Sequence, residues 1–213
     1  TRGLVNWRDL SLLGASLGGA IAVRQQWDDD VRDFTADHPE RWGGASDALG
    51  KIGEVQYQIP IMFGVYGYSL YSENEELHSL TKSIISAYTI SSVTTLGVKL
   101  IADTDRPSPE WNNGHYGFPS YHTSSSFAIA AVLEEYEGFA VALPAYGLAG
   151  MIAWSRIDQR DHDLSDVLFG GALGYIIGKS VAKQHKGSDA RMRLGPYAHP
   201  LDPAAGLAAE WRY

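Results

Sequence analysis

Apolar residues recur along the chain in long runs at helical spacing, and each run ends at charged residues, glycine or proline. A period near 3.6 residues is typical of helices that bury one face, whereas strands alternate with a period of two. The pattern therefore predicts an all-α protein. The predicted helices are 9–24, 47–71 with an interruption near Pro60, 75–103, 121–136, 138–154 and 164–184.

The segments between these helices carry less periodicity. Proline, asparagine and glycine between Arg106 and Pro119 predict an irregular loop that leads back into a helix. Residues 186–213 lose the helical period, and we expect them to form a non-helical tail. The sequence has no internal repeat and no Gly/Ser linker, so residues 1–213 are predicted to form a single helical-bundle domain.

Two of the apolar runs, 55–72 and 138–155, are uncharged and reach the roughly 18 residues at which a membrane-spanning helix becomes a candidate. The first run contains Gln56, Gln58 and Pro60, the second contains Pro144, and the mean hydropathy of the whole chain is -0.17. We therefore favour buried helices of a soluble bundle. An integral membrane protein remains the alternative.

Composition narrows the possible partners. The formal charge of -8 argues against a nucleic-acid partner, because binding to a phosphate backbone needs a broad cationic surface. The chain has no cysteine, which excludes disulfides, thiolate catalysis and cysteine metal sites. It begins Thr1-Arg2-Gly3 without a methionine, and we expect an exported, periplasmic protein whose signal peptide has been removed.

The first stretch with chemical potential is KLIADTDRP, in which Lys99 and Arg106 stand seven residues apart. On a helix these two cations fall on nearly the same face. An isolated pair of this kind is more often solvated near a helix C-terminus, where cations favour the helix dipole. Asp103 and Asp105 form a D-x-D, but they lack the ligand count of a hard metal site, so we expect them to be exposed or ion-paired.

The second stretch is FPSYHTSSS, where Ser120 follows a proline and precedes an apolar helix. Ser120 has the sequence position of an N-cap. A helix N-terminus also attracts anions, so the Ser120 hydroxyl and the Tyr121 backbone N–H are candidate donors to an anion. His122 follows directly, but a nucleophile elbow is excluded because the glycines of G-x-S-x-G are missing.

The third stretch is SRIDQRDHDLSD, which places His162 and Asp166 four residues apart, where a carboxylate can orient an imidazole. A surface ion pair has the same spacing. Arg156 adds a cation just upstream. The neighbours Arg160, Asp161 and Asp163 are predicted to be solvated.

Together the three stretches supply two histidines, three cations, a serine hydroxyl and a helix N-terminus in an otherwise acidic chain. A phosphate ester matches this set, since phosphoryl transfer needs positive donors around the phosphoryl oxygens, a nucleophile and a proton for the leaving oxygen. No metal and no cofactor are required if the cations provide the charge.

The motifs K-x6-R-P, P-S-x-H and S-R-x5-H-x3-D, present here in that order between residues 99 and 166, resemble the three signatures of the type 2 phosphatidic acid phosphatase superfamily. This family includes bacterial acid phosphatases, membrane lipid phosphatases and vanadium haloperoxidases. The resemblance implies a helical bundle of the acid phosphatase and vanadium haloperoxidase type. It says nothing specific about the first hundred residues.

The resemblance also implies a role for each motif residue. His162 would attack phosphorus, Asp166 would hold its other nitrogen, and His122 would protonate the leaving group and then activate water. Donors from all three motifs would bind the phosphoryl group. These are Lys99, Arg106, Ser120, the Tyr121 backbone N–H and Arg156.

One residue departs from the family pattern, because Tyr121 stands where glycine is usual. If that position required a positive φ, the pocket would be strained. The leading prediction is a metal-independent phosphatase acting on phosphate monoesters, either small molecules or lipid and polyprenyl phosphates, with vanadate binding as a phosphate mimic. The alternatives are a vanadate-dependent haloperoxidase and a catalytically impaired protein that binds phosphate or lipid head groups.

Overall fold

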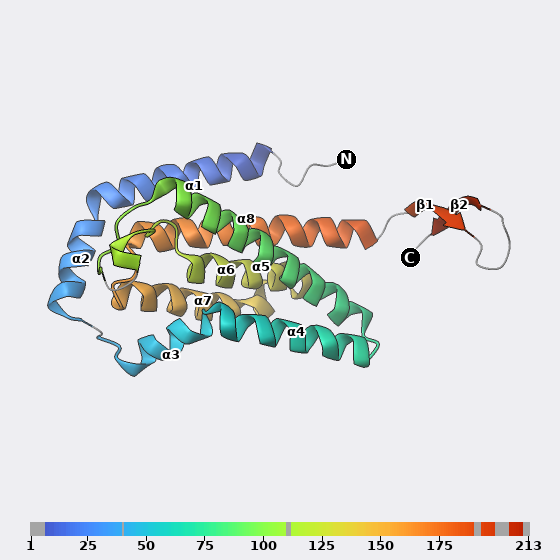
Figure 1. The fold of residues 1–213 in the computed structure, drawn as a ribbon, viewed down its shortest axis with the longest axis horizontal. Coiled ribbons are helices and arrows are strands. Elements are labelled where there is room, and N and C mark those ends of the chain that lie inside the picture. The colour runs from blue at the N-terminus through green and yellow to red at the C-terminus, as the bar shows by residue number, and fades with distance from the viewer. Residues whose placement is uncertain (1–6, 40, 110–111, 190–192, 199–204, 211–213) are drawn as a thin grey trace.

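The computed structural model describes residues 7–39, 41–109, 112–189, 193–198 and 205–210, and within them the protein is a bundle of α-helices (Figure 1). The all-α prediction is therefore confirmed. The helices are α1 (Trp7–Gln26), α2 (Asp28–Asp37), α3 (Gly44–Ile52), α4 (Val55–Tyr71), α5 (Glu75–Ala102), α6 (Tyr121–Glu137), α7 (Phe139–Asp158) and α8 (Leu164–Asp189). A 3-10 turn, η1 (Asn112–Gly114), interrupts the loop before α6, and the strands β1 (Arg193–Ala198) and β2 (Ala205–Glu210) form an antiparallel hairpin.

The helix boundaries differ from the prediction in three places. The expected break near Pro60 is wrong: the chain breaks between α3 and α4, and Pro60 lies inside α4. Pro60 lies in the second turn of α4, where it removes the backbone hydrogen bond to residue i−4, yet the helix continues through it. Helix α2 was not predicted, because its sequence DDDVRDFTAD carries few apolar residues. Helix α8 also extends four residues into the expected tail, to Asp189.

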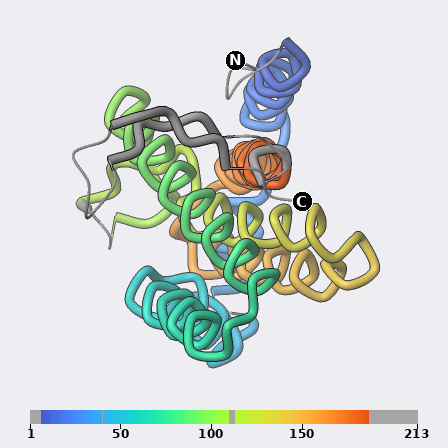
Figure 2. Tube along the Cα trace, turned by 90° about the vertical axis from the view of Figure 1, so that its right-hand side faces the viewer, coloured from blue at the N-terminus to red at the C-terminus, as the bar shows by residue number. Residues whose placement is uncertain are grey.

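Helix α8 packs against α1, α5 and α6, as the end-on view of Figure 2 shows. Its contact with α6 is close because glycines recur along α8 with a spacing of four. A Cβ at Gly170, Gly174 or Gly178 would collide with backbone atoms of α6 or of its cap, Ser120. The two helices therefore approach each other backbone to backbone, a geometry that small residues permit.

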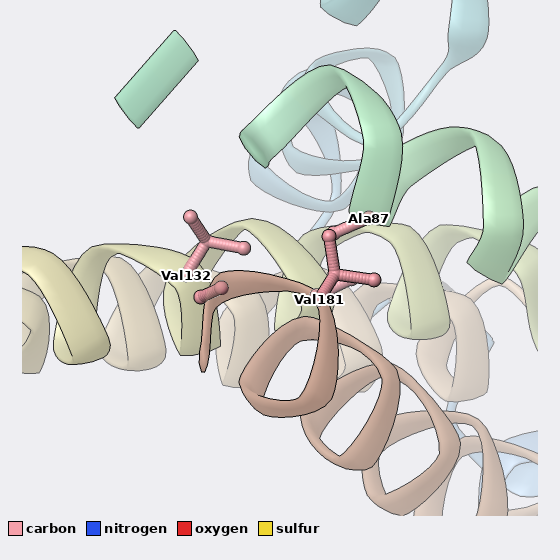
Figure 3. Close-up of a cluster of buried hydrophobic side chains, with 5 residues drawn as sticks. Ala87, Val132 and Val181 are labelled. Carbon is pink, nitrogen blue, oxygen red and sulfur yellow. The ribbon is translucent and has the colours of Figure 1, made fainter. Parts of the chain in front are cut away.

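Small side chains also fill the hydrophobic cluster where α5, α6 and α8 meet, which contains Ala87, Val132 and Val181 (Figure 3). All three are almost completely buried. This cluster fixes the relative positions of the three helices that carry the predicted motifs. The end of α5, the start of α6 and the start of α8 therefore lie at the same end of the bundle, which α2 and α3 cross (Figure 1).

Candidate active site

The predicted site residues come from four separate segments that meet at this end of the bundle. Lys99 lies in the last turn of α5, and Arg106 lies in the loop that follows. Ser120, Tyr121 and His122 begin α6, Arg156 lies in the last turn of α7, and His162 and Asp166 flank the start of α8. The structure thus brings all eight residues together.

Lys99 and Arg106 hold the loop before α6 by its carbonyl groups. The buried Lys99 Nζ donates to the carbonyl oxygens of Tyr116 and Gly117, at 2.7 and 2.9 Å. Arg106 donates through Nε to His115 O at 2.9 Å and through Nη2 to Tyr116 O at 3.3 Å. Both cations are therefore fixed in place by hydrogen bonds to the protein. They are not the solvated pair that their spacing alone would favour.

Gly117 explains how this loop comes so close to the site. A Cβ on Gly117 would lie 3.0 Å from Asp105 O and 3.3 Å from Asp166 Oδ2. Any larger residue would push the loop away from Asp166, so this glycine is required by close approach. In the sequence, only the proline, asparagine and glycine content of the loop indicated an irregular turn here, and nothing indicated the close packing of Gly117.

Ser120 is the N-cap of α6, and its buried hydroxyl accepts hydrogen bonds from the backbone N–H of Thr123 and from Thr123 Oγ1, the latter at 3.0 Å. The hydroxyl hydrogen of Ser120 remains available to an anion. Within the described part of the chain, no acceptor binds the backbone N–H of Tyr121, as expected for the first turn of a helix. Ser120 can therefore cap α6 and donate a hydrogen bond to an anion at the same time.

Tyr121 does not have the positive φ that would have strained the pocket. It starts α6 with helical geometry, and its ring points toward α5. There its phenol oxygen lies 2.8 Å from the Tyr88 hydroxyl and accepts from Ser92 Oγ at 3.2 Å. Tyr121 therefore attaches the start of α6 to α5 while its backbone N–H stays at the site.

His162 and Asp166 form the expected pair, with Nδ1 of the imidazole 3.2 Å from Oδ2 of the carboxylate. Both side chains are buried, which excludes a surface ion pair. Burial lowers the pKa of His162 well below its ordinary value, and the charges of Lys99, Arg106 and Arg156 lower it further. His162 is therefore neutral at pH 7, and besides its contact with Asp166 it has a backbone hydrogen bond with Gly117.

Two buried nitrogen atoms at the site lack a hydrogen-bond partner among the described residues. They are His122 Nε2 and Arg156 Nε. The other guanidinium nitrogens of Arg156 are engaged, by Asp161 and, at 2.7 Å, by Gln159 Oε1. Buried polar atoms are rarely left unsatisfied, so these two nitrogens mark a place where an anion can accept hydrogen bonds.

Helix α2 contacts the residues just after His162, a contribution that the sequence did not reveal. Arg32 on α2 donates to both carboxylate oxygens of Asp163, at 2.7 and 2.6 Å. Asp28 accepts from the backbone N–H and the hydroxyl of Ser165, at 3.0 and 2.5 Å. The residues in these contacts are more than 130 positions apart in the chain, so the contacts could not be predicted from the spacing of residues within a motif.

The prediction that Asp161 and Asp163 are solvated is wrong. Both are buried, with 3% and 1% of their surface exposed. Each is paired with an arginine, Asp161 with Arg156 and Asp163 with Arg32. Buried carboxylates need such partners, and the partners only become neighbours once the helices pack. The exposed Asp103 behaves as predicted, since it pairs with His115 at 3.5 Å.

An apolar cavity of about 250 Å³ adjoins the site. It lies between α4, α5, α6 and α7, and most of its lining side chains are aliphatic. These include Ile61, Met62, Val65, Ile84, Ile129, Leu148 and Ile152. A Cβ on Gly53 would lie 2.8 Å from His122 Cδ2 and 2.9 Å from Ile152 Cγ2, so this glycine lies between a site residue and a side chain that lines the cavity.

The arrangement can bind a tetrahedral anion and move protons around it. Electrostatic interactions link His122 with Arg156, His162, Lys99 and Arg106, and the same three cations act on His162, so both imidazoles lie near one group of cations. A neutral imidazole with an oriented second nitrogen can act as a nucleophile, and a second imidazole can exchange a proton.

Comparisons with known proteins concern the family and the fold of the chain. The family model of the PAP2 superfamily matches residues 81–189, which is just over half of the chain. A search of curated proteins found no match.

Two solved structures share the fold. One is the transmembrane PAP2 type phosphatidylglycerolphosphate phosphatase from Bacillus subtilis, with a TM-score of 0.68, 19% identity, and coverage of 86% of this chain and 96% of that chain. The other is Aquifex aeolicus LpxE, with a TM-score of 0.54, 22% identity, and coverage of 65% and 83%. At these identities the likeness concerns the fold.

Proposed function

Since the chain belongs to the PAP2 superfamily, we propose that it is a membrane-embedded phosphatase that hydrolyses lipid phosphate monoesters through a phosphohistidine intermediate. The observation that carries this proposal is the meeting of two histidines and three cations, from separate segments, at one end of an apolar bundle.

His162 is the nucleophile of the proposed reaction. Its Nδ1–H donates to Asp166, and Nε2 attacks phosphorus to form a P–N bond as the bond to the lipid oxygen breaks. The low pKa of His162 keeps Nε2 unprotonated in the resting enzyme. Asp166 stabilises the positive charge that develops on the ring during attack.

In the proposed cycle His122 is protonated to the imidazolium when the phosphate dianion binds beside it. It then gives this proton to the leaving alkoxide and takes a proton back from the water that cleaves the P–N bond. This returns both histidines to their starting state and releases inorganic phosphate. Lys99, Arg106 and Arg156 offset the charge on the phosphoryl oxygens, and the Tyr121 N–H at the start of α6 adds a backbone donor. These groups supply the charge stabilisation without a metal ion.

The surface of the bundle favours the membrane alternative over a soluble bundle. α5 and α7 are long and apolar enough to cross a membrane, yet only 28% and 33% of their apolar stretches are buried. The core helix of a soluble protein would be mostly buried. Large apolar side chains instead face outward on α4, α5 and α7, among them Ile61, Phe63, Tyr71, Val93, Leu100, Ile101, Phe139 and Val141.

A lipid substrate follows from the position of the site. If α4 to α8 cross the bilayer, the site lies at one end of these helices, where lipid head groups are found. The apolar cavity beside His122 then extends from the head-group level toward the hydrocarbon.

The phosphatase proposal is tested by following phosphate release from dioctanoyl phosphatidic acid in detergent. We expect wild-type turnover to persist in EDTA, to be inhibited by vanadate, and to disappear in His162→Ala. Rapid quench with labelled substrate should trap a phosphoenzyme, and His122→Ala should slow turnover by about 10²- to 10⁴-fold. Turnover in His162→Ala would remove the proposed nucleophile, and loss of activity in EDTA would remove the metal-free mechanism.

The membrane proposal has its own test. After expression and membrane isolation, we expect the protein to resist extraction by alkaline carbonate and high salt and to dissolve only in detergent. Release into the aqueous fraction would favour the soluble bundle.

A further inference from the structure

The apolar cavity contains one polar position close to the site. Gln58 on α4 is 8% exposed, and its Nε2 donates to Ser126 Oγ at 3.3 Å. Its Oε1 accepts from Ser125 Oγ at 3.2 Å. Gln58 and Ser126 both line the cavity, whose other walls are mostly aliphatic.

These two side chains have hydrogen-bonding capacity to spare. The amide nitrogen of Gln58 carries two hydrogens, and one of them accounts for the bond to Ser126. Ser126 Oγ accepts that bond, and its own hydrogen has no acceptor among the described residues. Two donors therefore face a cavity that otherwise suits hydrocarbon, and a buried donor without a partner is unfavourable.

The donors lie at a defined depth below the site. His122, Ser126 and Ile129 follow each other on one face of α6, with His122 at the site and the other two on the cavity wall. Four residues of helix rise about 6 Å. In an acylglycerol phosphate, the ester carbonyl carbon is about five bonds from phosphorus, a reach of roughly 6 Å at ordinary bond lengths.

We propose that Gln58 and Ser126 form a subsite that binds the ester carbonyl of an acylglycerol phosphate, while the aliphatic walls beyond them bind its acyl chain. This inference rests on the proposed function, since it places the phosphate between His122 and His162. It assigns the substrate to ester-linked glycerolipids. A polyprenyl phosphate has no polar group at this depth and would leave both donors unsatisfied.

The test compares two substrates that differ only in the carbonyl groups: a diacylglycerol phosphate and the dialkyl ether of matched chain length. We expect wild-type kcat/KM to favour the ester by about tenfold, the effect of one well-placed hydrogen bond. Gln58→Leu keeps the size of the side chain and should remove this preference by lowering the rate on the ester alone. Ser126→Ala should reduce the preference in the same direction.

Ser69→Ala is the matched control. Ser69 is a buried polar residue on the same helix, away from the cavity, and it contacts Tyr66 O and His78. Its removal should leave the ratio of the two rates unchanged. Equal wild-type rates on ester and ether would overturn the proposal, as would a Gln58→Leu variant that slows both substrates equally, because that result means that Gln58 only joins α4 to α6.

A binding measurement separates this proposal from the phosphatase proposal. The shift in melting temperature caused by each lipid in detergent does not depend on turnover. A larger shift with the ester in wild type, absent in Gln58→Leu, supports the subsite even if no lipid is hydrolysed. Equal shifts with both lipids overturn it, whatever the enzyme assay shows.

Discussion

The ion pair between Arg32 and Asp163 allows a sharp prediction about the first helices of the chain. Arg32 on α2 contacts both carboxylate oxygens of Asp163, the residue that directly follows His162. The Asp163 side chain is completely buried, whereas that of Arg32 is 31% exposed. Removing Arg32 and removing Asp163 should therefore lower the free energy of unfolding by different amounts.

Arg32→Ala leaves a buried carboxylate without its cation. Breaking a fully buried pair costs about 3–5 kcal/mol, and because Arg32 is partly solvated we expect about 2–3 kcal/mol of unfolding free energy to be lost. Asp163→Asn leaves an arginine that can turn to water, which should cost about 1 kcal/mol. Burial already raises the pKa of Asp163, and loss of Arg32 raises it further, so the Arg32→Ala deficit should shrink at low pH as the carboxyl is protonated.

Denaturant unfolding in detergent micelles measures these differences, with a double-mutant cycle for the pair. We expect a coupling free energy near 2 kcal/mol, and a lower kcat for Arg32→Ala because the Asp163 N–H donates to Asp166 Oδ2 at 3.0 Å. Arg8→Ala, at an exposed position on α1, is the control and should change stability by no more than about 0.5 kcal/mol. Equal losses in the two single variants, with additive behaviour in the double variant, would refute the reasoning.

Three further outcomes follow from the site. Tyr121→Phe removes two hydroxyl contacts with α5 and should lower the free energy of unfolding by about 1–3 kcal/mol while kcat changes little; an unchanged stability would contradict the anchoring role. Gly53→Ala places a Cβ within 3.0 Å of His122 and Ile152 and should lower kcat about tenfold or more in the phosphate-release assay, so wild-type kcat would argue against that packing. Because the pKa of His162 is lowered in the folded state, the unfolded state binds more protons below about pH 6.5, and the free energy of unfolding should fall as the pH drops through that value. His162→Gln should reduce this change in unfolding free energy with pH by at most about 1.4 kcal/mol per pH unit. An identical pH dependence in wild type and variant would contradict the pKa shift.

Much of this protein could be predicted from local patterns. Helices α5 to α8 follow the apolar period closely, and their predicted boundaries lie within a few residues of the observed ones. Residue spacing also identified all eight candidate site residues, because each motif is a short continuous stretch at helix ends and in the loops beside them, and it needs no distant partner to be visible. Helix α2 escaped prediction, since its stability comes from Arg32 and Asp28 pairing with residues near α8.

The surrounding structure was harder to predict for physical reasons. Asp161 and Asp163 look like surface residues in the sequence, because charged side chains are normally solvated. They become buried when α2 and the last turn of α7 supply arginines. In the same way, an apolar helix has the same sequence signature in a soluble core and in a bilayer, so the low burial of the apolar stretches of α5 and α7 is known only from the packed structure.

The sequence by itself determined the helical class and singled out the candidate site residues, because helical periodicity and motif spacing are local properties of the chain. Tertiary structure alone decided which charges are buried, how Tyr121 is anchored, and which side chains line the apolar cavity. Those properties depend on contacts between residues far apart in the chain, which exist only after the helices have packed.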